Sequence, residues 1–343
     1  MSLKAWLQLF RAQTWPATML LIMTPFLHNA SFLTWETRAM FVSTILFHYL
    51  MFGQNSLMDT SQGYDLKDPA KSHHPLITGE ISLTSAHNVI HWGLALATVW
   101  AMVLTLLVSP VPEMAMGALL IWVVFGWGYN LGLSKESIWG WVSLDIGYTG
   151  MGMWAWLMSH SEITFEAVIY LAYVWLLLMF QITWEGFLKD MELSERSNII
   201  KKLGGSVYNI SAQGHRVVQR DSMGIMRFDP GWKGLIYAWA VKLANLFVLI
   251  PLVPSSWSPE LWRGIWFTGM GLAAVFFANK LIAARVYDRS QELLNMSLEE
   301  VVSIYLIVPI MLPWSTAVPL MLLGVIYFFG INMLLWGTPY PRV

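Results

Sequence analysis

Long apolar segments separated by polar ones dominate the sequence from near its first residue to its last. An apolar run of about 20 residues is the length that crosses the hydrocarbon core of a bilayer as a helix. Nine segments have this character: roughly 15–34, 38–58, 84–108, 113–131, 138–159, 164–188, 232–253, 261–284 and 301–337. The last segment is too long for one crossing, and a break near Pro313-Trp314 would give a tenth crossing or a re-entrant piece. The pattern predicts an all-α, polytopic membrane protein with a bundle of about nine transmembrane helices.

The polar segments between the runs alternate between long and short, which places them on opposite sides of a membrane. The long ones are 59–83, 132–137, 189–231 and 285–300, and the short ones are 35–37, 109–112, 160–163 and 254–260. The long side, with the N-terminal segment, holds fifteen of the 20 Lys and Arg residues; the short side holds three, counting Arg342 if the C-terminus lies there. Cytoplasmic loops carry such an excess of positive residues, so the long side is predicted to face the cytoplasm.

Composition agrees with a membrane protein. Of 343 residues, 56% are hydrophobic and 12% are charged, against about 25% charged in a soluble domain. We therefore expect membrane lipid around the chain and no nucleic acid partner. The absence of cysteine excludes disulfides and thiolate metal sites. We expect one transmembrane domain over 1–343, with an amphipathic segment at 1–14 and a cytoplasmic cap loop at 189–231.

A first group of acidic residues closes the second apolar run. Asn55 and Asp59 are four residues apart, so they project from one face of a helix. Asp65 and Asp68 follow after Gly63. Amide and carboxylate oxygens suit Mg²⁺, which takes few protein ligands and keeps positions for water and phosphate. A solvated loop is the better explanation for Asp65 and Asp68 taken alone, whereas Asn55 and Asp59, which close an apolar helix, are harder to explain that way.

A second group closes the sixth run, within Asp190-Met-Glu192-Leu-Ser-Glu195. If the helix continues through this group, four side chains of alternating charge lie along one face: Glu185, Lys189, Glu192 and Arg196. A row of surface ion pairs explains these four residues without any catalytic or binding role. Asp190 lies off this row and is the residue that the ladder leaves unexplained. The apolar runs place both acidic groups on the same side of the membrane, where they can build one site.

The two groups together resemble the motifs of the UbiA superfamily of intramembrane prenyltransferases. The first resembles the NDxxDxxxGxD form of the family's first Asp-rich motif, matched at Asn55, Asp59, Gly63 and Asp65. The second resembles a degraded KDxxDxxGD motif, of which Lys189 and Asp190 remain. Three further segments are similar to the family. Arg11, Pro16 and Pro25 resemble the start of its first helix, and residues 74–82 resemble its Arg-Pro-Leu-Pro-Ser-Gly-Arg-Ile-Ser segment. The third segment is the loop from Tyr129 to Lys135, followed by Asp145 and a glycine-rich run.

The sequence also departs from these motifs. Ser56 replaces the usual Asp beside the Asn, and His74 replaces a common Arg. In the second motif Ser194 stands where an acid is usual, and Glu195 follows it. These changes leave metal binding in place at the first motif and make the second depend mainly on Asp190.

The resemblance implies a bundle around a central cavity that opens to the cytoplasm and binds a polyprenyl diphosphate through Mg²⁺. The implied metal ligands are Asn55, Asp59, Asp65, Asp68, Asp190 and Glu195. The implied diphosphate contacts are Arg11, Lys71, Lys135, Lys189, Lys201 and Lys202, and the last two lie in a loop that either closes over the site or stays solvated. Asp59, Asp190 and Tyr129 are the implied catalytic residues, with Tyr129, Trp122 and Trp127 as aromatic walls around an allylic cation. The implied reaction is transfer of the prenyl group to an aromatic or lipid acceptor.

Other interpretations remain open from the sequence. A terpene cyclase of the same superfamily would use the same ionisation, and the motifs do not separate the two. A transporter would show internal repeats and helices broken at the midplane, and no convincing repeat is visible. Asp145 is predicted within a helix, where it either orients an acceptor or pairs with Lys242 or Lys280; we expect the pairing.

Overall fold

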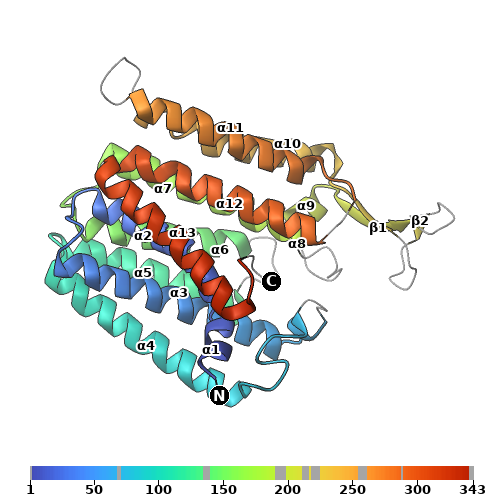
Figure 1. Cartoon of the computed structure of the whole chain (residues 1–343), viewed down its shortest axis with the longest axis horizontal. Helices are drawn as coiled ribbons and strands as arrows, with labels where there is room; N and C mark the ends of the chain where they lie inside the picture. Colours follow the sequence, from blue (N-terminus) through green and yellow to red (C-terminus); the bar gives the residue numbers. More distant parts are fainter. Residues whose placement is uncertain are drawn as a thin grey trace.

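The computed structural model describes residues 2–67, 71–133, 140–189, 198–210, 216–217, 225–253, 261–286 and 289–339. In this part of the chain ten helices have 13 or more residues and form one bundle (Figure 1): α2 (Trp15–Leu27), α3 (Trp35–Ser61), α4 (Leu83–Val108), α5 (Pro112–Gly128), α6 (Gly140–Leu157), α7 (Phe165–Phe180), α10 (Gly231–Phe247), α11 (Leu261–Ala283), α12 (Arg289–Met311) and α13 (Trp314–Trp336). Seven helices among the described residues are long and apolar enough to cross a membrane. The predicted class, a polytopic helical membrane protein, is therefore confirmed.

Short elements extend or connect the long helices. They are α1 (Leu3–Leu9), η1 (Ala12–Thr14), η2 (Asp65–Lys67), η4 (Tyr129–Leu133), η5 (Gln181–Glu185), α8 (Gly186–Lys189), α9 (Ile199–Lys202) and η6 (Ile250–Leu252). Three strands form an antiparallel sheet in the order β2-β1-β3: β1 (Ser206–Ile210), β2 (Arg216–Val217) and β3 (Ile225–Asp229). The sheet projects from the bundle at the right of Figure 1. The expected cap loop at 189–231 therefore contains a helix and a sheet, with Phe228 fully buried.

The helix ends form two groups, which we call the short-loop end and the long-loop end. At the short-loop end, the Asn29 side chain donates to the Ser159 carbonyl oxygen over 2.7 Å, and Ser109 donates to Leu157 over 2.6 Å. Connections 28–34, 109–111 and 158–164 therefore lie together. Helices α3 and α7 both start there, so α3 and α8 both end at the long-loop end, α3 near α1 and α8 on the side of the sheet (Figure 1). This arrangement is what a shared site for the two acidic groups requires.

Two segment boundaries differ from expectation. Residues 285–300 were expected as a loop, but α12 starts at Arg289. The polar residues that suggested a loop, Glu292, Asn295 and Glu299, are at most 6% exposed, because they face the interior of the bundle. The first span is also shorter than predicted, since α2 ends at Leu27 instead of residue 34.

The break expected near Pro313 is present and creates an extra long helix. Helix α12 ends at Met311 and α13 starts at Trp314, because Pro313 has no backbone N–H with which to continue the helix. Helix α13 then runs back to the long-loop end, where Trp336 packs against His73 with ring centroids 5.3 Å apart. Both ends of the described chain therefore lie at the long-loop end.

Helices α5 and α6 pack closely through glycine. A Cβ atom added at Gly147 would lie 2.9 Å from the backbone nitrogen of Gly126, and one at Gly150 would lie 3.1 Å from the carbonyl oxygen of Ala118. Small residues of this kind let helix backbones approach in a membrane, where no hydrophobic force drives helices together. This contact fixes α6 against the helix that leads into Tyr129.

Candidate functional site

The end of α3 gathers the first acidic group. The Asn55 side chain donates to Oδ2 of Asp59 over 3.1 Å, as the four-residue spacing predicts. The helix stops at Ser61, and Gly63 follows with φ of +79°, a value that glycine adopts without strain. This turn lets the Tyr64 backbone N–H donate to the Asp59 carbonyl oxygen over 2.9 Å. The chain folds back on the helix end, so Asp65 comes to lie beside it.

Asp65 is buried in this fold-back and accepts a 3.4 Å hydrogen bond from the Thr60 hydroxyl. Asp59 is also buried, with 6% of its surface exposed. Asn55, Asp59 and Asp65 therefore present carboxylate and amide oxygens at the end of one helix. Asp68 lies outside the described residues.

Positive groups surround these acids. Arg11 and Lys71 both lie within electrostatic range of His74, as does Asp59. Arg11 adopts a left-handed backbone conformation (φ +48°) between α1 and η1, and its guanidinium lies 5.8 Å from the centre of the Phe52 ring. Lys71 is 8% exposed. Two of the predicted diphosphate contacts therefore lie beside the first acidic group.

His74 stands where the motif usually has an arginine. Burial, followed by the nearby charges of Lys71, Arg11 and His73, lowers its pKa to about 3, and Asp59 opposes this. Neither ring nitrogen has a hydrogen-bond partner among the described residues. His74 is thus neutral near pH 7, and the positive charge in this part of the site comes from Arg11 and Lys71.

The helix that leads to the second acidic group changes from α-helical to π-helical geometry before it ends. Residues Gln181–Glu185 form a π-helical turn, η5, between α7 and α8. A π turn adds a residue to the helix and shifts the direction of the side chains that follow. Glu185 consequently points inward, with 4% exposure, and lies next to Glu299. The expected surface ladder is wrong for Glu185.

The remaining predicted residues of the second group are only partly described. Helix α8 ends at Lys189, whose backbone alone is described, and Asp190, Glu195 and Lys135 lie outside the described residues. Lys201 is half-buried and Lys202 is exposed on α9, which packs against η5. The Asn198 side chain holds α9 there by donating to the Thr183 carbonyl oxygen over 3.2 Å.

The three aromatic residues predicted to surround the cation differ in their surroundings. Tyr129 starts η4, a second π turn, which follows α5. It lies within electrostatic range of Tyr148 on α6. Trp122 is 2% exposed and packs on Phe47, with ring centroids 4.1 Å apart, so it serves packing between α3 and α5. Trp127 is half-buried, and its indole N–H has no hydrogen-bond partner among the described residues.

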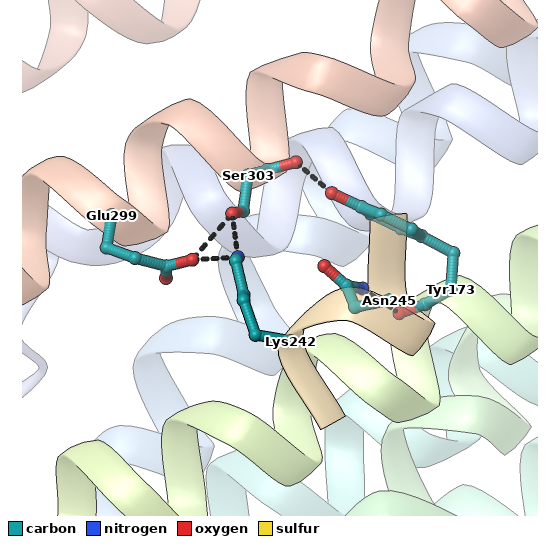
Figure 2. Close-up of polar contacts among 5 residues, drawn as sticks. All are labelled: Tyr173, Lys242, Asn245, Glu299 and Ser303. Carbon is teal, nitrogen blue, oxygen red and sulfur yellow. Dashed lines mark hydrogen bonds and ion pairs between the residues drawn. The ribbon is translucent and has the colours of Figure 1, made fainter. Parts of the chain in front are cut away.

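A buried polar network that the sequence did not reveal joins α7, α10 and α12 (Figure 2). Lys242 forms an ion pair with Glu299 and donates to the Ser303 hydroxyl over 2.7 Å. Ser303 in turn donates to Glu299 over 2.8 Å. Tyr173 donates to the Ser303 carbonyl oxygen, and Asn245 donates to the Tyr173 carbonyl oxygen over 3.0 Å. Lys242 and Glu299 are both fully buried.

This network corrects the expected partner of Asp145. Lys242 is paired with Glu299, and Lys280 is exposed with its ammonium 4.8 Å from the Phe276 ring centre. Neither carboxylate oxygen of Asp145 has a hydrogen-bond partner within the described part of the chain. The i, i+4 spacing of Glu299 and Ser303 was a usable signal, but Glu299 lies in the stretch 285–300, which is expected as a loop, and Ser303 lies in the apolar segment that follows.

The residues at the end of α3 fit a cation that binds few protein groups. In the described ranges no three His, Cys, Asp or Glu side chains gather closely enough to hold a metal by themselves. Asn55, Asp59 and Asp65 offer oxygens at one helix end, next to two cationic side chains that suit an anion. Such a donor set fits Mg²⁺, which keeps water and phosphate oxygens in its shell.

The fold is that of solved UbiA homologues. A UbiA homologue from Aeropyrum pernix K1 in its apo form is 13% identical, with a TM-score of 0.59 over 91% of this chain and 98% of that one. A UbiA homologue from Archaeoglobus fulgidus bound to GPP and Mg²⁺ is also 13% identical, with a TM-score of 0.56 over 88% of this chain and 99% of that one.

A third similar structure is that of a digeranylgeranylglyceryl phosphate synthase. It is 14% identical, with a TM-score of 0.54 over 96% of this chain and 98% of that one. No family model matches the sequence, and no curated protein matches it. The likeness therefore lies in the arrangement of the helices.

Proposed function

We propose that this chain is a Mg²⁺-dependent intramembrane prenyltransferase of the UbiA superfamily, which transfers a prenyl group from a polyprenyl diphosphate to an aromatic or lipid acceptor. The observation that carries the proposal is the grouping of Asn55, Asp59 and Asp65 with Arg11 and Lys71 at one end of the bundle. The proposal is supported by the fold shared with a UbiA homologue that binds GPP and Mg²⁺.

The chain's own residues have separate tasks in this proposal. Asn55, Asp59 and Asp65 hold Mg²⁺, with Asp68, Asp190 and Glu195 as further ligands. Bound Mg²⁺ supplies charge neutralisation for the diphosphate leaving group. Arg11 and Lys71 bind diphosphate oxygens, together with Lys135, Lys189, Lys201 and Lys202.

The interior next to this site protects the prenyl cation. Tyr129 presents an aromatic face on which positive charge is stabilised by the ring quadrupole. The packed helices exclude water, so the cation is captured by the acceptor instead of being hydrolysed. We propose that the site faces the cytoplasm, in agreement with the excess of Lys and Arg in the long segments.

Binding of geranyl diphosphate to the purified protein tests the proposal. Titration calorimetry should show binding with Mg²⁺ and none with EDTA, because carboxylates and diphosphate repel each other without the cation. Asp59→Asn should weaken this binding by roughly 30-fold or more, which corresponds to about 2 kcal/mol. Glu80→Ala is the matched control, since Glu80 is an exposed acid on the same connection as Asp65.

Glu80→Ala should bind like the unaltered protein, and both variants should keep the same melting temperature. Binding that is independent of Mg²⁺, or an Asp59→Asn variant that binds geranyl diphosphate normally, would contradict the proposal. Product mass with and without added acceptor then separates prenyl transfer from cyclisation.

A further inference from the structure

Asp145 is a buried acid that the proposed metal and diphosphate sites do not use. It lies on α6 with no exposed surface, and neither of its carboxylate oxygens has a hydrogen-bond partner among the described residues. Burying an acid without a hydrogen-bond partner is unfavourable, because the interior does not replace its hydration. An acid at membrane depth with no structural partner points to a ligand that supplies the missing donor.

The neighbours of Asp145 place it in the interior next to the proposed active site. Tyr237 on α10 lies beside both Asp145 and Thr183 of η5. One turn further along α6, Tyr148 lies within electrostatic range of Tyr129 and of Glu300 on α12. Asp145 therefore lies where α6, η5 and α10 meet, near the tyrosine that we assign to the prenyl cation.

Acidic groups outnumber basic ones in the described part of this interior. Glu185 lies next to Glu299 and Glu300, and Lys242 is bonded to Glu299. With Asp145, four carboxyl groups thus stand beside one lysine, which is already paired. An anionic ligand next to Asp145 would therefore be buried without a free cation, which is unfavourable in a medium of low dielectric constant. A molecule that approaches Asp145 gains from donating a hydrogen bond and loses from carrying negative charge.

We propose that Asp145 recognises the acceptor, and that this acceptor is a neutral molecule that donates a hydroxyl hydrogen bond to its carboxylate. This inference rests on the proposed prenyltransferase function and adds the chemistry of the second substrate. Asp145 selects the acceptor by its hydrogen-bond donor, because an analogue without the donor leaves the buried acid unpaired. Carboxylated acceptors are disfavoured because Lys242, the lysine of this region, is already paired with Glu299.

Three probes built on the same naphthalene ring test the assignment with Asp145→Leu, which keeps the branched shape of the side chain and removes both oxygens: 2-naphthol, 2-methoxynaphthalene and 6-hydroxy-2-naphthoate. Titration calorimetry on the full chain, in detergent with Mg²⁺ and geranyl diphosphate present, measures the affinity for each probe. The unaltered protein should bind 2-naphthol at least roughly tenfold more tightly than the other two. In Asp145→Leu the preference over the ether should shrink to within about twofold, while the preference over the anion and the affinity for geranyl diphosphate stay unchanged.

A lipid alcohol, 1-O-octylglycerol, distinguishes the source of the hydroxyl and should show the same dependence on Asp145 if the acceptor is a lipid. Thr24→Val is the control, because Thr24 is a fully buried hydroxyl without a described partner on α2. It should leave every probe affinity unchanged. The melting temperature without probe should rise in Asp145→Leu, since an unpaired buried polar group is removed; a purely structural role predicts a fall.

The inference is overturned if the unaltered protein does not distinguish 2-naphthol from its ether, or if Asp145→Leu keeps the full preference over the ether. A fall in melting temperature of Asp145→Leu also overturns it. Each of these results leaves binding of geranyl diphosphate intact, and so leaves the proposed function standing. If the unaltered protein does not bind geranyl diphosphate with Mg²⁺, the proposed function fails and this inference fails with it.

Discussion

Lys242 and Glu299 show how a charged side chain survives inside the bundle. Both are fully buried, and each bonds to the other and to Ser303. Removing one partner of a buried pair leaves an isolated charge, whereas removing both leaves only a change in packing. The pair therefore stabilises the contact of α10 with α12 mainly because losing one partner would leave the other charge buried and unpaired. The attraction between the two charges contributes less.

Lys242→Met alone should lower the free energy of unfolding by about 3–5 kcal/mol, because Glu299 is left buried without its cation. The double variant Lys242→Met, Glu299→Gln should recover more than half of that loss. Unfolding of the purified protein in detergent measures both. Lys280→Met, which changes an exposed lysine on α11, should leave stability unaltered; equal losses in the single and double variants would contradict the account.

The histidines at the short-loop end predict a dependence of stability on pH. Nδ1 of His28 and Nε2 of His160 are 3.1 Å apart, and burial lowers the pKa of both rings. The unfolded chain titrates near the ordinary value of about 6.5 and so binds more protons below it. The stabilisation is complete above that value and declines as the pH falls through it.

The melting temperature should therefore drop between pH 7.5 and pH 5, and the drop should be smaller in His28→Asn, His160→Gln. The matched control is His87→Asn on α4, an exposed histidine, which should keep the full drop. Scanning calorimetry at both pH values compares the three proteins. A double variant with an undiminished drop would show that these two rings do not carry the effect.

The residue scale is also where prediction from sequence is most uneven. Asn55 and Asp59 were predictable because a four-residue spacing fixes one helical face, and the structure bonds them directly. Glu185 was not, because a π turn reverses the face that an α-helical period assigns to it. Glu299 was missed because a buried ion pair has the same composition as an exposed loop.

At the scale of elements, hydropathy locates helices well where a helix is apolar on every side. It places α4, α5 and α11 within a few residues of their observed ends. It fails for the start of α12, where one face is polar and buried, and for 198–230, where short strands leave no apolar run. A hydropathy pattern assumes that buried positions are apolar. A helix face that is buried against polar side chains therefore goes undetected.

The close contact of α5 with α6 gives a test at this scale. Gly147→Ala should cost about 1–3 kcal/mol, because its Cβ would meet the backbone of Gly126. Gly117→Ala on α5 is the control, since a Cβ there has no atom within 4 Å, and it should be neutral or stabilising by up to about 1 kcal/mol. Thermal unfolding of the two variants should therefore change in opposite directions, and a tolerated Gly147→Ala would exclude tight packing at this point.

At the scale of the whole molecule, the break before Trp314 decides how the chain crosses the membrane. It turns the last apolar segment into two helices, so α13 returns to the long-loop end beside α1. The excess of Lys and Arg in the long segments predicts that this end faces the cytoplasm.

The lack of cysteine makes that orientation simple to measure. Gln62→Cys and Glu162→Cys place single thiols on exposed positions at the long-loop and short-loop ends. A maleimide that does not cross membranes should label Gln62→Cys only from the cytoplasmic side of sealed vesicles, and Glu162→Cys only from the other side. Labelling of both from one side would contradict a membrane-spanning bundle, and a reversed pattern would contradict the predicted orientation.

The return of α13 has a practical consequence for engineering this protein. Because α1 and α13 contact each other, a short flexible linker can tie the two termini together without passing through lipid. Circular permutants can then be made, because a chain with joined termini can be opened at an exposed connection while the helices keep their packing. A second catalyst fused at either terminus would also be tethered at the long-loop end, beside the proposed diphosphate site, which would shorten the path between successive reactions.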